Sequence, residues 1–153
     1  MIQFFKKEFI LFLSFFSSKS QKLVTKWTKE HKEIIVLAHK VIAEYSLNNY
    51  AVAKKHLVQL NKVTINHLMI EDIELYKLLK EDKTTDEKVK KLIIEFKESF
   101  RTIKISLMKV LTKYSQPKIV LDEIFFKTFS ELVDILLVRI EFEEKNLYIT
   151  LNK

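Results

Sequence analysis

The segment HLMIEDIELY (residues 67–76) has a close counterpart in RIEFEEKNLY (residues 139–148), and this internal match decides the expected fold. In both segments, polar residues four positions apart are followed by a Leu-Tyr pair at the same spacing. Residues four apart lie on one face of an α-helix. The match predicts two helix hairpins related by a pseudo-twofold axis, with equivalent residues of the two hairpins directed toward each other.

Four polar residues of these segments lie on helix faces that are otherwise apolar: His67 and Glu71 in the first, Arg139 and Glu143 in the second. His31 also lies on the apolar face of its own helical segment, one turn before Ile34 and Ile35. A buried polar group without a partner is strongly destabilising, so these side chains need a compensating interaction. Metal coordination is one such interaction, and a network of ion pairs is another.

Apolar residues recur at helical spacing in four stretches, and polar breaks at residues 47–49, 81–86 and 115–117 separate them. Thr84 followed by Glu87 resembles a capping box, and Pro117 suits the first turn of a helix. The chain has no Gly and a single Pro, which disfavours the tight turns of β-hairpins. We therefore predict an all-α fold.

The four stretches, joined by short connections, are expected to form an up-down-up-down antiparallel four-helix bundle over residues 21–153. Residues 1–20 contain Lys6 and Lys7 ahead of an apolar run at 9–16, which is too short to span a membrane. No small-residue cleavage site follows this run, so a signal peptide is not expected. We predict an amphipathic N-terminal helix or arm that packs on the bundle, on a partner or on a membrane surface.

Composition narrows the function. The chain has no Cys, which excludes disulfides and thiolate chemistry and is compatible with a reducing compartment, so we expect a cytoplasmic protein. The net charge of +7 comes mainly from lysines that are interleaved with acidic residues, and nucleic-acid binding is not expected. None of the four histidines follows a Glu by three positions, as in di-metal oxidases, and no nucleophile motif is present, so we predict that the protein is not an enzyme.

The stretch WTKEH (residues 27–31), taken with the two matched segments, resembles the hemerythrin-like (HHE cation-binding) family over about residues 27–151. The resemblance implies a four-helix bundle around a diiron centre, with histidines from all four helices and two bridging carboxylates. It implies that His31, His67 and Glu71 are metal ligands and that Glu143 is the second bridging carboxylate.

The chain departs from this pattern in its second half, because the third helical stretch has no His and Arg139 stands where a ligand His is expected. Arginine stays protonated and cannot bind a metal, so a normal diiron centre is not expected. Two arrangements remain open. In one, a single iron or zinc ion is bound by His31, His67 and Glu71. In the other, the site is metal-free, Arg139 pairs with Glu71 and Glu143, and His31 and His67 hydrogen-bond to carboxylates.

His39 and His56 are expected to lie away from the site. The incomplete diiron pattern favours a sensory or regulatory module, linked to metal, oxygen or redox state and acting on a protein partner. The alternative is a metal-free structural or interaction bundle that docks to a membrane surface or a partner through residues 1–20.

Overall fold

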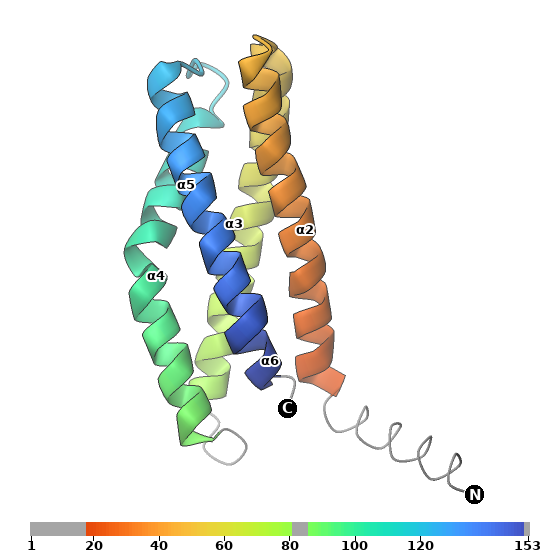
Figure 1. Ribbon diagram of the computed structural model, residues 1–153, viewed down its shortest axis with the longest axis vertical. Helices are drawn as coiled ribbons and strands as arrows, with labels where there is room; N and C mark the ends of the chain where they lie inside the picture. Colours follow the sequence, from red (N-terminus) through yellow and green to blue (C-terminus); the bar gives the residue numbers. More distant parts are fainter. Residues whose placement is uncertain (1–17, 81–85, 152–153) are drawn as a thin grey trace, which may run out of the picture.

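The computed structural model describes residues 18–80 and 86–151. These residues form the helices α2 (Ser18–Ser46), α3 (Tyr50–Lys80), α4 (Glu87–Tyr114) and α5 (Glu123–Phe142), followed by a π-helical turn, η1 (Glu143–Leu147), and the short α6 (Tyr148–Leu151). No strand occurs in the described residues, and the prediction of an all-α bundle is confirmed (Figure 1).

The four long helices lie lengthwise beside one another, and Figure 1 shows consecutive helices running in opposite directions along the long axis. The main contacts join α2 to α3, α3 to α4 and α4 to α5, and α5 also packs on α2. Each helix thus has two neighbours, and the faces that point inward enclose one common core. Within the described ranges, no helix contains an apolar stretch long enough to cross a membrane.

The three predicted breaks fall between helices, but the helix start predicted at Pro117 was wrong. Helix α4 begins directly after its predicted break and is capped by Asp86, whose side chain accepts a hydrogen bond from the Lys88 amide; the predicted capping residue Thr84 lies outside the described residues. Helix α5 begins at Glu123 because Asp122 caps it by accepting from the Phe125 amide at 2.8 Å. Pro117 lies in the connection before it.

The predicted arm falls almost wholly on residues 1–17, which lie outside the described residues. Helix α2 already begins at Ser18, three residues before the predicted start of the bundle at residue 21. The connection between α2 and α3 turns at Asn48, which has a φ of 63°. Asn tolerates this left-handed conformation better than most residues, which suits it to the end of a helix.

Two apolar clusters form the core. The larger one includes Leu57, Leu111 and Phe129, and the smaller one includes Trp27 and Leu75. On α2, His31 lies between the residues of the two clusters, and on α3 Glu71 does so, whereas His67 and Arg139 directly precede Leu68 and Ile140 of the larger cluster. The bundle therefore encloses a polar layer between two apolar layers.

Candidate metal centre

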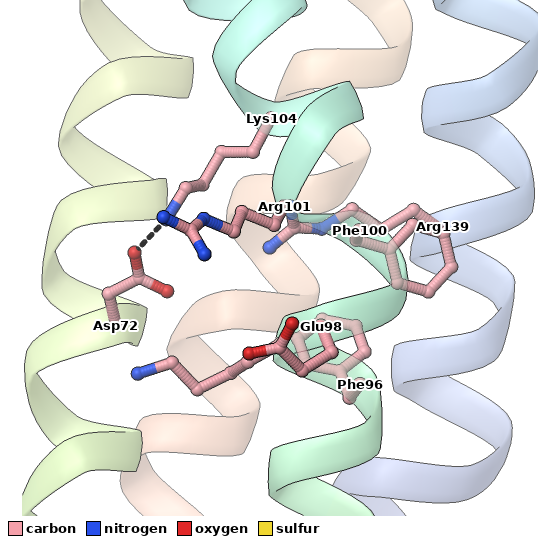
Figure 2. A pocket seen from close by; sticks show the side chains of 8 residues that line it. Asp72, Phe96, Glu98, Phe100, Arg101, Lys104 and Arg139 are labelled. Carbon is pink, nitrogen blue, oxygen red and sulfur yellow. Dashed lines mark hydrogen bonds and ion pairs between the residues drawn. The ribbon is translucent and has the colours of Figure 1, made fainter.

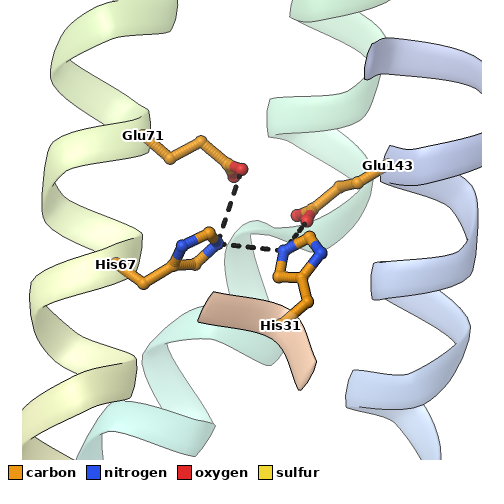
Figure 3. Close-up of side chains that lie close together, drawn as sticks. All are labelled: His31, His67, Glu71 and Glu143. Atoms are coloured by element: carbon orange, nitrogen blue, oxygen red, sulfur yellow. Dashed lines mark hydrogen bonds and ion pairs between the residues drawn. The ribbon is translucent and has the colours of Figure 1, made fainter. Parts of the chain in front are cut away.

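The four residues predicted to bind metal come together in the polar layer. His31 comes from α2, His67 and Glu71 come from α3, and Glu143 is the first residue of η1 (Figure 3). All four side chains are buried, and one ligand atom from each lies within 4.8 Å of the other three. The helical spacing that put these residues on core faces thus predicted a real cluster.

The two histidines point the same ring atom into the centre of the cluster. The Nε2 atoms of His31 and His67 are 3.1 Å apart. Outside the centre, Nδ1 of His31 lies 3.0 Å from Oε1 of Glu144, and Nδ1 of His67 lies 2.9 Å from Oε2 of Glu30. A carboxylate beside Nδ1 holds the proton on that nitrogen and leaves Nε2 as the coordinating atom.

The two central carboxylates divide their oxygens between the histidines and Arg139. Oε2 of Glu143 lies 2.9 Å from Nε2 of His31, and Oε2 of Glu71 lies 3.6 Å from Nε2 of His67. Arg139 donates from Nε to Oε1 of Glu143 at 2.7 Å and from Nη2 to Oε1 of Glu71 at 3.2 Å. The pairing of Arg139 with both carboxylates, which was expected for the metal-free arrangement, is therefore present.

Tyr148 completes the cluster because of the π-helical turn. In η1 the Tyr148 amide bonds to the carbonyl of Glu143, five residues earlier, so Tyr148 lies over Glu143. Its hydroxyl donates to Oε2 of Glu71 and lies 3.2 Å from Nε2 of His31, and its ring stacks on His31. The matched residue in regular α3 is Tyr76, which is 51% exposed.

No family model, no curated protein and no solved structure matches this chain. The likeness to hemerythrin-like proteins thus stays a prediction from the sequence, and the metal centre has to be judged on its own geometry.

The residues present fit one metal ion better than two. At the level of the cluster, α4 contributes Phe96 and Phe100, whose ring centroids lie 5.0 and 5.7 Å from the Arg139 guanidinium. Neither side chain has an atom that can bind a metal. Arg139 occupies the place and supplies the positive charge that a second ion would bring. Two imidazole nitrogens and two carboxylate oxygens are the donor set that Zn²⁺ and Fe²⁺ accept.

A small cavity adjoins three of the four candidate ligands. Its volume is about 10 Å³, and Thr64, His31, His67 and Glu143 are among the residues that line it. The buried hydroxyl of Thr64 has no hydrogen-bond partner among the described residues. A space of this size holds about one water molecule, which suits a water on a further coordination position of a metal.

The other two histidines lie away from this cluster. His39 is exposed and His56 is half-buried, and neither belongs to the set that could hold a metal in the described structure. Sequence reasoning missed three contributors, which are Glu30, Glu144 and Tyr148. Each of them lies beside or near a predicted ligand in the sequence, and this proximity was the one sequence feature that could have indicated their contribution.

Burial and charge set unequal pKa values in the cluster. Burial, and then the charge of Glu143, raise the pKa of Glu71 from 4.5 to about 8. Burial also acts to raise the pKa of Glu143, but the hydrogen bond from His31 and the charge of Arg139 outweigh it and lower that pKa to about 2. Without a metal, Glu71 therefore keeps its proton at neutral pH, whereas Glu143 is ionised.

The histidines shift in opposite directions. Burial acts to lower the pKa of His31, but its hydrogen bond and charge interaction with Glu143 raise it overall. Burial, and then the charge of His31, lower the pKa of His67. His31 therefore binds a proton more readily than His67 when no metal is present.

Replacing Arg139 should expose how much the carboxylates depend on it. We expect Arg139→Met to destabilise the metal-free protein by about 3–5 kcal/mol, because it leaves Glu71 and Glu143 buried without their cation. Urea denaturation measures this change. The matched control is Arg101→Met on the exposed side of α4, expected to change stability by about 0.5 kcal/mol or less. Equal effects of the two substitutions would contradict the assignment.

The raised pKa of Glu71 predicts a stability that falls as pH rises. The folded protein binds this proton more tightly than the unfolded chain, so the stabilisation is complete below pH 4.5 and is lost as pH rises through about 8. The expected slope from Glu71 is about −1.4 kcal/mol per pH unit between these values. His31 acts in the same direction and His67 in the opposite one.

Urea denaturation of the metal-free protein at a series of pH values measures this slope. Glu71→Gln, which cannot ionise, should show a much flatter profile over the same range. A wild-type slope that the substitution leaves unchanged would rule out Glu71 as its source.

Proposed function

We propose that this protein binds a single divalent transition-metal ion, Zn²⁺ or Fe²⁺, through His31, His67, Glu71 and Glu143, and that it acts as a metal-linked sensory or regulatory module. The observation that carries the proposal is the orientation of the two imidazoles. Both Nε2 atoms face one point, and both Nδ1 atoms are held by carboxylates outside it. Metal-binding histidines are typically supported in this way.

The charges of the cluster suit a dication. Glu71, Glu143 and the two outer carboxylates, Glu30 and Glu144, surround the site, and within the described structure Arg139 pairs with the two central carboxylates and Lys26 with Glu30. A divalent ion bound by neutral imidazoles would take the place of the protons that otherwise hold these groups together. Its ligands would be the inward-facing oxygens, since Arg139 binds the other oxygen of each central carboxylate.

The C-terminal turn is the element best placed to respond to the metal. Glu143, Glu144 and Tyr148 all contact His31, so η1 and the start of α6 depend on the state of the cluster. A ligand changes an equilibrium between two conformations only when it binds one of them better. A metal that holds Glu143 in place would favour the docked form of this turn, which supports a regulatory role in the cytoplasm toward a protein partner.

The alternative is a metal-free structural or interaction bundle. It is favoured by the fact that Arg139 and Tyr148 already give both central carboxylates hydrogen-bond partners without a metal. In that case the protein would act through its surfaces, including residues 1–20. Metal analysis separates the two functions.

Elemental analysis of the untagged protein, purified from iron- or zinc-supplemented cells, tests the site. We expect about one metal ion per chain, because the donor set fits one tetrahedral or five-coordinate ion. His67→Ala should lose the ion, since it removes a ligand. Arg139→His should allow a second ion to bind, because it replaces the site-filling cation with a ligand.

Two histidines supply matched controls for the loss of a ligand. His56 lies on the same helix as His67, and His39 lies on the same helix as His31. The variants His56→Ala and His39→Ala should both keep the ion. A wild-type protein without metal, or a His67→Ala variant that keeps it, would support the metal-free alternative.

Hydrogen exchange tests the regulatory part of the proposal. Adding Zn²⁺ to the metal-free protein should slow exchange of the amides in residues 143–151 by about tenfold or more, because coordination of Glu143 restricts opening of the turn. Amides of α2 and α3 near residues 46–53, at the far end of the bundle, should change little. If metal binds and the C-terminal amides do not respond, the protein binds metal without this switch.

A further inference from the structure

A second and larger cavity opens between α3 and α4 and reaches α5 at its floor (Figure 2). Its volume is about 270 Å³, close to the lower end of the range for small-molecule sites. The residues that line it are mainly charged or aromatic: Asp72, Phe96, Lys97, Glu98, Phe100, Arg101, Lys104 and Arg139.

The cavity carries more positive than negative charge, with four cations against two carboxylates. Lys104 forms an ion pair with Asp72 across the cleft, as Figure 2 shows. Arg101 has no carboxylate partner among the described residues, although it lines the same cavity. Lys97 lies 5.9 Å from the ring of Tyr76 and forms no ion pair within the described chain. Two cations are therefore available to a ligand.

We propose that this cleft binds a small anion that carries a phosphate group. The guanidinium of Arg101 can donate two parallel hydrogen bonds to a phosphate, and Lys97 can add a point charge from one turn away on α4. Phe96 and Phe100 form an apolar wall that suits the carbon part of a small phosphate ester. The cleft is larger than a bare phosphate needs, which favours such an ester.

Arg139 connects this cleft to the buried cluster. Its Nε and Nη2 atoms bind Glu143 and Glu71, while the same side chain lines the floor of the cleft. An anion bound there would attract Arg139 and weaken its hold on the two carboxylates. Less of their negative charge would then be neutralised, and their inward-facing oxygens would bind a metal more tightly. This coupling rests on the proposed metal function, whereas anion binding does not.

Isothermal titration of the full-length, metal-free protein with glycerol 3-phosphate and inorganic phosphate tests the cleft, with glycerol as the neutral control. We expect saturable binding of both anions, tighter for the ester, and no binding of glycerol. The double variant Lys97→Gln/Arg101→Gln should bind about tenfold more weakly. The matched control, Lys109→Gln/Lys113→Gln, removes the same charge from α4 outside the cleft and should bind normally.

Absence of saturable binding to any phosphate, or equal weakening in the two double variants, would overturn the proposal. A phosphate group could also belong to a lipid, and vesicles of phosphatidylcholine with and without phosphatidic acid distinguish the two sources. Binding to phosphatidic acid that requires Lys97 and Arg101, without binding of glycerol 3-phosphate, would support the site and assign the phosphate to a lipid.

The coupling is tested by titrating Zn²⁺ with and without sulfate, a tetrahedral anion that forms only weak complexes with zinc. We expect sulfate to raise the affinity for Zn²⁺ by several-fold in the wild type and to have no effect in Lys97→Gln/Arg101→Gln. If phosphate binds but sulfate leaves Zn²⁺ affinity unchanged, the coupling is wrong. If neither Zn²⁺ nor Fe²⁺ binds, the proposed function fails, and the anion site is still decided by the titration of the metal-free protein.

Discussion

The buried contact of Arg139 with Glu71 and Glu143 is the interaction on which the centre of this bundle depends. Burial strongly disfavours the charged form of the two carboxylates enclosed among the four helices, and a cation beside them offsets part of this cost. Arg139 supplies that cation from α5 and orients one oxygen of each carboxylate toward itself. The other oxygens are left facing His31 and His67, so the guanidinium also determines where a metal could bind.

The end of the chain is organised around the same cluster. A continuous α-helix would carry residues five positions apart to different faces, as α3 does with Glu71 and the exposed Tyr76. The π-helical turn at Glu143–Leu147 instead brings Tyr148 over Glu143, and places Glu143 and Glu144 against the two nitrogens of His31. Single turns of this kind are frequent at functional sites. Here the turn makes the two halves of the bundle chemically different.

The same asymmetry links the interior to the surface. On the side of α2 and α3 the cluster is closed by aromatic and carboxylate contacts to the histidines, including Trp27 and Glu30. On the side of α4 it meets Phe96 and Phe100, and beyond them the charged cleft. Arg139 belongs to both regions. A change in charge in the cleft can therefore reach the carboxylates through one side chain, without movement of a whole helix.

The sequence by itself determined the all-α bundle and the four central residues of the site, because helical periodicity places His31, His67, Glu71 and Glu143 on faces that must be buried. The pairing of Arg139 with the carboxylates was expected for one of the two arrangements that the sequence left open, since a buried arginine stays charged and needs anions. The sequence could not give the true start of α5, where Asp122 competes with the helix-start signal of Pro117 over a few residues. Only the tertiary structure decided the π-helical turn, the inward position of Tyr148, the outer carboxylates on each histidine and the charged cleft. These features depend on how the helices pack and on which side chains of neighbouring helices come into contact. The spacing of residues along a single helix does not contain that information.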